Sequence, residues 1–241
     1  MKILVTVKQV PDTSGKVAVN PDGTLDRASM QTIINPDDLN AVEAALALKD
    51  ELGCKVVAFT MGPPPAEGML RELMAMGVDE GVLITAREFG GSDTYATSQI
   101  IAAGIDTYGV EEDDIILAGR QAIDGDTAQV GPQVAEKLGL PQVTYAEEIT
   151  EIKADSLVIK RRLNCGMETV ETPVPVVVTV NASAPECRPR NAKRVMTCKF
   201  ALAKSEIAAA PDSPAAKRAA AEQELGRIEG ELKQKLLEIN K

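Results

Sequence analysis

Residues 119–132, GRQAIDGDTAQVGP, combine the glycines, hydroxyl groups and carboxylates that could hold an anionic ligand or a metal ion. The stretch follows the apolar run DDIILA and precedes QVAEKLG, which is typical of a helix. A glycine-bearing turn between a strand and a helix commonly binds phosphate through backbone amides. Asp124 and Asp126 would repel phosphate, however. Three interpretations therefore stay open: a phosphate-binding turn, a metal site, or a capped helix start.

The metal interpretation has the weakest support, because no third hard ligand lies near the two aspartates. As a cap, Asp126 could accept an amide hydrogen bond from the first turn of the following helix. Thr127, Gln129 and the amides of 125–129 would then remain as neutral donors for a phosphate, with Asp124 turned away or contacting a ribose hydroxyl. Arg120 is the nearest cation along this loop and could offset the acids or form a surface ion pair.

Two other turns, VKQVPDT (7–13) and TMGPPP (60–65), also follow strand-like runs. Ligands of open α/β sheets lie in the crevice outside the carboxyl ends of the strands, so the three turns could build one pocket there. TMGPPP is equally typical of a plain turn leading into a helix. The chain has neither a G-x-G-x-x-G fingerprint nor a P-loop lysine motif, so a nucleotide would use a different loop.

Composition excludes several classes of protein. The chain has no histidine, which rules out histidine-based triads and histidine metal sites. Its four cysteines form no C-x-x-C pair and are typical of free thiols in a reducing cytoplasm. A net charge of −10 and only 2% aromatic residues argue against nucleic-acid or anionic-membrane binding. No run approaches the roughly 20 apolar residues of a membrane span, so we expect a cytoplasmic protein without a membrane partner.

Strand-like and helical segments alternate through the first 140 residues. The expected strands are KILVTV, KVVAFT, GVLITA and DDIILAG, at 2–7, 55–60, 81–86 and 113–119. The expected helices lie at 37–53, 66–77, 92–109 and 127–139. This order predicts an α/β fold: a mostly parallel sheet with helices on both faces, Rossmann-like and suited to nucleotide binding.

The pattern changes after residue 142. Short strand-like runs follow one another up to 180, with a β-hairpin turning near Asn164-Cys165-Gly166. We therefore predict one domain over residues 1–200 and a linker with a helical C-terminal arm over 201–241. An apolar stripe in this arm would dock on a partner chain or on the body of the protein; it consists of Leu225, Ile228, Leu232 and Leu236.

Several segments within residues 1–200 are characteristic in sequence. They are VKQVPD (7–12), INPDDLNAVEAAL (34–46), the TMGP turn, RELMAMGVDEGVLI (71–84) and GRQAIDGDTAQVGPQVAEKLGLPQVT (119–144), with PVPVVVTV after the hairpin. On these segments the chain resembles the small (beta) subunit of electron transfer flavoproteins. The ID-x-D-x-x-Q-x-G pattern in the 119–144 segment is the most specific of these.

The resemblance implies one subunit of a heterodimeric, flavin-based electron carrier whose large (alpha) subunit holds FAD. In this family the small subunit holds AMP in plain carriers and a second FAD in electron-bifurcating ones. VKQVPDT and the small residues Gly125 and Ala128 resemble the bifurcating type. That type takes a hydride from NADH, sends one electron to ferredoxin or flavodoxin, and sends the other through the FAD of the large subunit to a flavin dehydrogenase.

No acid–base side chain is implied, because the flavin carries the chemistry. Two alternatives remain: a non-bifurcating carrier with structural AMP, and an adenine-nucleotide sensor without a redox role.

The family's nucleotide contacts can be transferred position by position. The adenine and ribose contacts fall on Thr6, Asn35, Pro36, Asp37, Asp38 and Met61. The phosphate contacts fall on the loop that contains Gly119, Arg120, Gln121, Ala122, Asp124, Gly125, Asp126, Thr127, Ala128, Gln129, Val130 and Gly131. No metal ligand is implied.

The loop that docks dehydrogenases in this family usually begins with Pro-Arg-aromatic and carries a bulky apolar anchor. Here it reads PECRPRNAKRVMTCK (185–199), with Ala192 where the anchor is expected. Its basic residues suit an acidic partner surface. The expected docking residues are Arg188, Arg190, Lys193 and Arg194. The departure leaves a lactate dehydrogenase as a competitor to an acyl-CoA dehydrogenase for the partner.

Overall fold

A computed structural model describes residues 1–12 and 31–203 of the chain. The chain divides into two compact units, Met1–Asn191 and a second unit that begins at Ala192. The predicted helical arm lies almost entirely outside the described residues. Within the described ranges, no helix combines the length and the apolar character that crossing a membrane requires.

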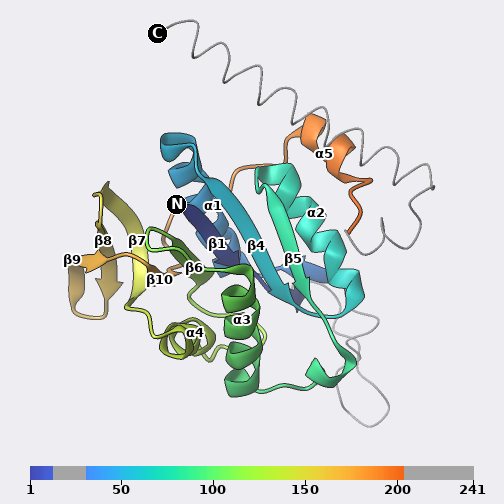
Figure 1. Cartoon of the computed structure of the whole chain (residues 1–241), viewed down its shortest axis with the longest axis horizontal. Helices are drawn as coiled ribbons and strands as arrows, with labels where there is room; N and C mark the ends of the chain where they lie inside the picture. The colour runs from blue at the N-terminus through green and yellow to red at the C-terminus, as the bar shows by residue number, and fades with distance from the viewer. Residues whose placement is uncertain (13–30, 204–241) are drawn as a thin grey trace, which may run out of the picture. The chain divides into compact units, whose positions relative to one another are not determined.

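The described part of the first unit forms an eight-stranded sheet with the order β5-β4-β1-β6-β10-β7-β8-β9, which Figure 1 shows. The first six of these strands run parallel, and β8 and β9 extend the sheet antiparallel. Their bounds are β1 Lys2–Thr6, β4 Lys55–Met61, β5 Glu80–Ile84, β6 Ile115–Gly119, β7 Gln142–Ile152, β8 Ser156–Leu163, β9 Gly166–Pro173 and β10 Val176–Val180.

Helices cover both faces of the sheet. On one face α1 (Pro36–Leu52) and α2 (Glu67–Met76) pack against the strands, and on the other α3 (Thr94–Tyr108) and α4 (Val130–Leu138) do so. The alternation of side chains along a strand explains this division. In β1, Ile3 and Val5 belong to the core under α1 and α2, whereas Leu4 belongs to the core under α3 and α4. The predicted fold class is confirmed.

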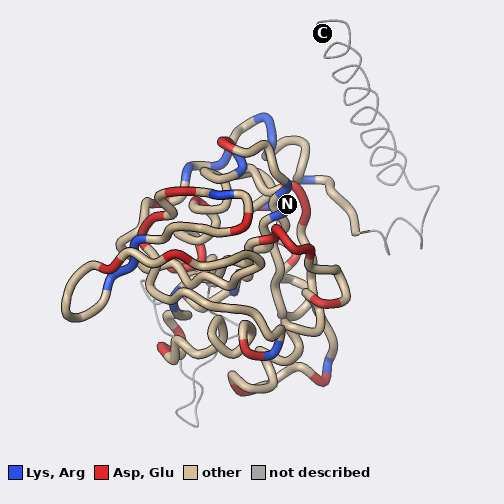
Figure 2. Tube along the Cα trace, turned by 60° about the vertical axis from the view of Figure 1, so that its left-hand side comes forward, with Lys and Arg blue, Asp and Glu red and all other residues tan. Residues whose placement is uncertain are grey.

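Residue types that favour helix ends lie at the observed ends of three helices. Pro36 occupies the first turn of α1, Gly77 ends α2, and Asp93 caps α3 by accepting the N–H of Ala96 at 2.8 Å. The hairpin turns at Asn164 and Cys165, because Leu163 pairs directly with Gly166. Acidic and basic residues are interspersed along the trace of the first unit (Figure 2).

Three features differ from the sequence prediction. The helix expected to start at 127 begins only at Val130. A short antiparallel pair, β2 (Gln9–Pro11) and β3 (Thr32–Ile34), follows β1 and was not predicted. In the second unit, the helix α5 (Ala192–Cys198) was not predicted.

Candidate functional site

The direction of chain winding reverses beside β1. From β1 the chain adds β4 and then β5 on one side, and after α3 it returns to add β6 on the other side. The elements that follow β1 and β6 then leave towards opposite faces, with α1 on one and α4 on the other. In α/β proteins such a switch point, at the carboxyl ends of the strands, is where ligands bind, and we call this edge of the sheet the switch-point crevice.

The predicted turns meet at this edge, as expected. Thr6 at the end of β1 pairs with Phe59 of β4 and with Ala118 of β6. Its hydroxyl lies 3.5 Å from the carbonyl oxygen of Leu117. Half-buried Met61 ends β4 two residues after Phe59. The loops after β1, β4 and β6 therefore lie next to one another.

Asn35 is fully buried and connects the start of α1 to the loop after β6. Its side-chain amide donates to the carbonyl oxygen of Gln121 at 2.8 Å, and its side-chain oxygen accepts the N–H of Ile123 at 3.1 Å. Its own N–H donates to the carbonyl oxygen of Lys8 at 2.9 Å. Because both ends of the side chain are engaged, Asn35 sets the position of the loop that carries Ala122.

Asp38 performs a similar connection one helical turn further on. Its carboxylate accepts the N–H of Lys8 at 2.7 Å and the N–H of Gly119 at 3.2 Å. Burial raises the pKa of Asp38 to about 7, against hydrogen bonds from Asn35, Lys8 and Gly119 that lower it. A Cβ on Gly119 would overlap Oδ1 of Asp38 and lie 2.6 Å from the carbonyl carbon of Asp37. Only glycine fits there.

The acids of the 119–131 loop are paired with neighbouring side chains. The Lys8 ammonium lies 2.7 and 2.8 Å from the two carboxylate oxygens of Asp124. Gln121 donates to Asp126 at 2.8 Å. With different partners for the two carboxylates, the metal interpretation loses its support.

Arg120 pairs with a residue outside its own loop. Its Nε lies 3.3 Å from Asp37. The charge of Asp124 is therefore balanced by Lys8 and not by Arg120. The sequence analysis did not predict this role for Lys8, although it named the VKQVPDT turn that contains it.

The start of α4 is open. The expectation that Asp126 caps this helix is wrong, because Gln129 occupies the cap position and no side chain accepts a hydrogen bond there. Asp126 and Ala128 both have a φ of 52°, a left-handed conformation that prevents the helix from starting earlier. None of the N–H groups of residues 127–131 donates to an acceptor in the described parts of the chain.

Packing holds this helix start against the sheet. A Cβ on Gly131 would lie 2.6 Å from the Thr179 methyl group, so glycine permits the close approach of α4 to β10. The hydroxyl of Thr94, at the start of α3, donates to the side-chain oxygen of Gln129 at 3.0 Å. Gly125 has open space where its Cβ would be. Free amides and the positive end of the α4 dipole can together bind an anionic group.

Arg188, predicted to dock a partner, is bound within the first unit. Its guanidinium contacts Glu43 of α1 at 2.8 Å and Asp50 at 2.6 Å, and its N–H donates to Glu43 at 2.9 Å. These bonds raise the pKa of Arg188 above its usual range. Asn40 donates to the carbonyl oxygens of Ala184 and Pro185, both at 2.9 Å. Arg188 thus fastens this segment to α1.

The other predicted docking residues are more exposed. Arg190 lies 3.4 Å from Glu72, and both side chains are about half exposed. Lys193 and Arg194 are exposed on α5. The same helix exposes the apolar side chains of Val195 and Met196, which sequence reasoning did not single out.

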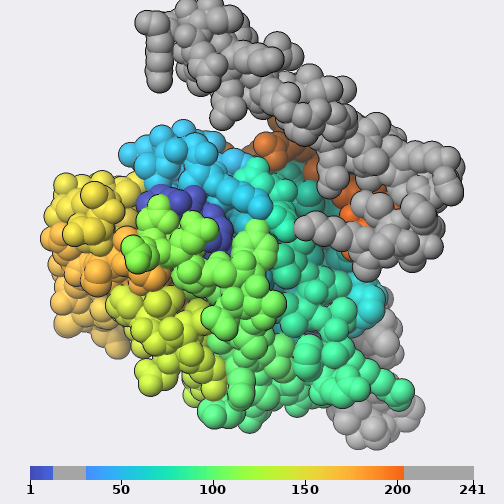
Figure 3. Space-filling model, in the orientation of Figure 1, coloured from blue at the N-terminus to red at the C-terminus, as the bar shows by residue number. Residues whose placement is uncertain are grey.

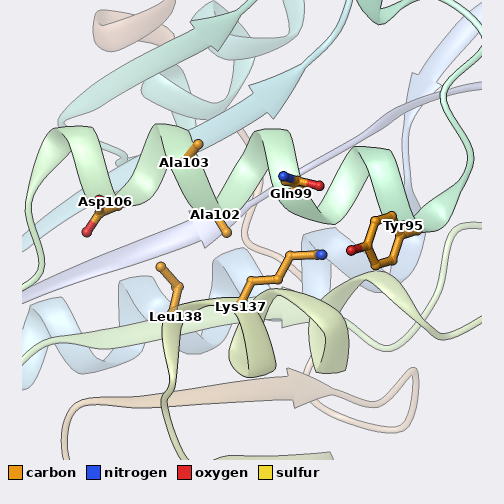
Figure 4. A pocket seen from close by; sticks show the side chains of 7 residues that line it. All are labelled: Tyr95, Gln99, Ala102, Ala103, Asp106, Lys137 and Leu138. Atoms are coloured by element: carbon orange, nitrogen blue, oxygen red, sulfur yellow. The ribbon is translucent and has the colours of Figure 1, made fainter.

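A concavity lies between α3 and α4, two helices on the face that Figure 3 shows. Its volume is about 410 Å³, and Figure 4 shows Lys137 extending towards the ring of Tyr95, with Nζ 3.7 Å from the ring centroid. Its lining consists of Tyr95, Gln99, Ala102, Ala103, Asp106, Lys137 and Leu138. None of these is a predicted nucleotide contact.

Comparison with known proteins gives consistent matches. The family model described as "Electron transfer flavoprotein domain" matches residues 22–205. Acryloyl-CoA reductase electron transfer subunit gamma of Anaerotignum propionicum is 66% identical over 179 residues, which cover 74% of this chain and 67% of that protein. Electron transfer flavoprotein subunit beta of Clostridium acetobutylicum is 54% identical over 180 residues, covering 74% and 68%.

A third relative has the same coverage. Caffeyl-CoA reductase-Etf complex subunit CarD of Acetobacterium woodii is 51% identical over 181 residues, which cover 74% of this chain and 68% of that protein. The topological switch point and the open start of α4 agree with these matches, which show that the chain belongs to the electron transfer flavoprotein family, as a beta subunit.

Proposed function

We propose that this chain is the small subunit of an electron-bifurcating electron transfer flavoprotein and that it binds FAD at the switch-point crevice. The proposed reaction takes two electrons from NADH as a hydride. One goes to ferredoxin or flavodoxin, and the other passes through the large subunit to a flavin-dependent reductase. When bound, FAD would supply the hydride acceptance and electron transfer that no side chain here can provide.

The observation that carries this proposal is the open start of α4. Five successive N–H groups, at residues 127–131, lack acceptors among the described residues at the edge where α/β proteins bind nucleotides. They would hold phosphate oxygens, with the hydroxyl of exposed Thr127 as a further donor. Thr6 and Met61 border the same edge and would face the adenosine part. The residues present therefore fit an adenine nucleotide.

Three observations favour FAD over AMP. The loop is open beside Gly125, and Ala128 adds only a methyl group, which leaves room for a larger cofactor. The turn after β1 has the VKQVPDT sequence that resembles bifurcating members. The similar proteins from Anaerotignum propionicum and Acetobacterium woodii are named as subunits of CoA-substrate reductases. The last of these also favours an acyl-CoA type of reductase over a lactate dehydrogenase as the partner.

Counting cofactors tests the choice. The chain would be purified with its co-expressed large subunit, and FAD and AMP would be quantified after denaturation. Two FAD per heterodimer, and flavin reduction by NADH without oxygen, are the expected results. One FAD and one AMP would instead establish the non-bifurcating carrier, and absence of flavin would favour the adenine-nucleotide sensor.

The partner surface needs a separate test. We propose that α5 and the preceding loop contact the reductase, since Val195 and Met196 offer an apolar centre beside basic residues. Arg188 is left unchanged because it binds α1. The combined variant Arg190→Glu, Lys193→Glu and Arg194→Glu should slow electron transfer to an acyl-CoA reductase at low salt.

Dye reduction by NADH should be unaffected in that variant. The control is Arg87→Glu, at an exposed arginine in the turn after β5. Unchanged transfer to the reductase, or an equal loss in the control, would exclude this surface as the contact.

A further inference from the structure

Asp38 lies where three segments of the first unit meet, and the residue is 7% exposed. It belongs to the first turn of α1, and it accepts one N–H from the loop after β1 and one from the end of β6. These are the two strands that border the switch-point crevice. The carboxylate therefore connects the loop after β1 to the end of β6 beside the proposed nucleotide site.

This bridge has little freedom to adjust. Gly119 has no room for a Cβ between Asp37 and Asp38, so the backbone of β6 lies directly against the start of α1. Asn35, in the preceding turn, ties the same helix start to Gln121 and Ile123. A change in the hydrogen bonds of Asp38 must therefore move the 119–131 loop relative to β1.

Ionisation decides which hydrogen bonds Asp38 can make. A carboxylate accepts at both oxygens, whereas in a carboxylic acid one oxygen carries an O–H donor and has less capacity to accept. The bond from Lys8 N–H is short at 2.7 Å, and that from Gly119 is longer at 3.2 Å, so protonation should sacrifice the Gly119 bond first.

The charges facing Asp38 do not neutralise it. Its neighbour in α1 is Asp37, whose negative charge disfavours the ionisation of Asp38. The guanidinium of Arg120 turns to Asp37, and the ammonium of Lys8 turns to Asp124. Burial without a cation raises the pKa of Asp38 to about 7, within the range in which proteins work.

We propose that Asp38 is a proton-sensitive positioning residue: its carboxylate holds the loops after β1 and β6 in the nucleotide-binding arrangement, and its protonation loosens nucleotide binding. This inference rests on the proposed function only in requiring an adenine nucleotide at the crevice. It does not depend on whether that nucleotide is FAD or AMP.

The test is calorimetric titration of the full chain with FAD, and separately with AMP, between about pH 6 and pH 8.5. In the wild type, FAD affinity should fall by about tenfold from about pH 8 to pH 6, as expected for the uptake of one proton. Asp38→Asn should bind about tenfold more weakly at pH 8 and should lose this pH dependence. The phosphate of AMP itself takes up a proton at about pH 6. For AMP, the pH dependence of Asp38→Asn is therefore subtracted from that of the wild type.

The matched control is Asp114→Asn. Asp114 is also buried and also accepts two backbone N–H groups, from Lys2 and Glu111, but at the opposite end of β1 and β6. It should keep the wild-type pH profile. A flat wild-type FAD profile, or one that Asp38→Asn shares, would overturn the inference and leave the proposed function intact. If Asp38→Asn does not fold, the wild-type FAD profile alone decides.

If the chain binds AMP but not FAD, the bifurcating proposal is overturned. The AMP titrations of the wild type and Asp38→Asn then decide the Asp38 inference. Binding of neither nucleotide at any pH would overturn both.

Discussion

Asp114 and Asp38 are both buried, and they lie at opposite ends of the strand pair β1–β6. At the amino end, Asp114 accepts the N–H groups of Lys2 and Glu111, both at 2.7 Å, and the Lys2 ammonium lies 2.6 Å away. At the carboxyl end, Asp38 also accepts two backbone N–H groups but has no cation beside it among the described residues. The nearby cations are paired with other carboxylates.

The difference separates a stabilising role from a positioning role. A buried charge with a cation and full hydrogen bonding is tolerated without a functional reason. A buried carboxylate without a cation destabilises the fold whenever it ionises, and such residues concentrate at functional sites. The amino edge of the sheet therefore looks optimised for stability, whereas the carboxyl edge retains a destabilising group where a ligand is expected.

Gly119→Ala should produce the largest effect, because it forces Asp38 and the start of α1 away from β6. We expect a loss of about 3 kcal/mol in the free energy of unfolding and loss of nucleotide binding. Urea unfolding and calorimetric titration measure the two. The control is Gly68→Ala in α2, where a Cβ meets nothing within 4 Å; it should change stability by less than about 1 kcal/mol, in the stabilising direction. Equal effects at the two positions would contradict the tight packing at Gly119.

Asp114→Asn tests the amino edge. Removing the charge leaves the Lys2 ammonium, which is 14% exposed, without its nearest partner, so we expect a loss of about 2 kcal/mol at neutral pH. Nucleotide affinity should stay within about twofold of wild type, because the residue lies at the far end of the strands. A tenfold loss of affinity in a folded variant would show that the two edges are not independent.

The pH dependence of stability distinguishes the two aspartates further. The pKa of folded Asp38 is about 7, above its ordinary 3.8, so its stabilising contribution is complete below about pH 4 and is lost as the pH rises through 7. Relative to Asp38→Asn, the wild type should lose about 1.4 kcal/mol between about pH 6 and pH 8. Urea unfolding at both pH values measures this difference. A constant difference between the proteins would mean that Asp38 does not titrate in this range.

Local patterns were sufficient to predict the fold class and the meeting of three turns at one edge of the sheet. Strand and helix periodicity gave the alternating elements, and the rule for carboxyl ends brought the turns after β1, β4 and β6 together. The start of α4 was misplaced because Asp126 is a good capping residue by type, whereas its left-handed backbone excludes that role. Backbone conformation of a non-glycine residue is set by the surrounding structure, and residue type gives little indication of it.

Contacts between distant residues could not be predicted. Lys8 and Asp124 are separated by 116 positions, and Asp38 and Gly119 by 81. Their pairing depends on the order of strands, which periodicity does not specify. Arg188 was predicted to dock a partner because it belongs to the basic loop that resembles the docking loop of the family. Folding brings it against Glu43 and Asp50 of α1, more than 130 positions earlier in the chain, so it pairs with them instead. The three-residue strands β2 and β3 are too short to give a periodic signal.

Lys8→Ala should have the smallest effect on stability. Together with Lys55→Ala it allows an exposed ion pair at each edge of the sheet to be compared. Lys8 is 49% exposed and pairs with Asp124 at the carboxyl edge; Lys55 is 47% exposed and pairs with Glu80 at the amino edge. Each alanine variant should cost about 0.5 kcal/mol of stability, because exposed pairs are screened by water. Only Lys8→Ala releases the loop that carries the free amides, so it alone should weaken nucleotide binding, by about threefold.

Titration of both variants with the same nucleotide measures this contrast, and added salt should reduce it. Equal affinities in the two variants would mean that the Lys8–Asp124 pair does not hold the loop. Asn35 and Asp38 would then be sufficient to position it.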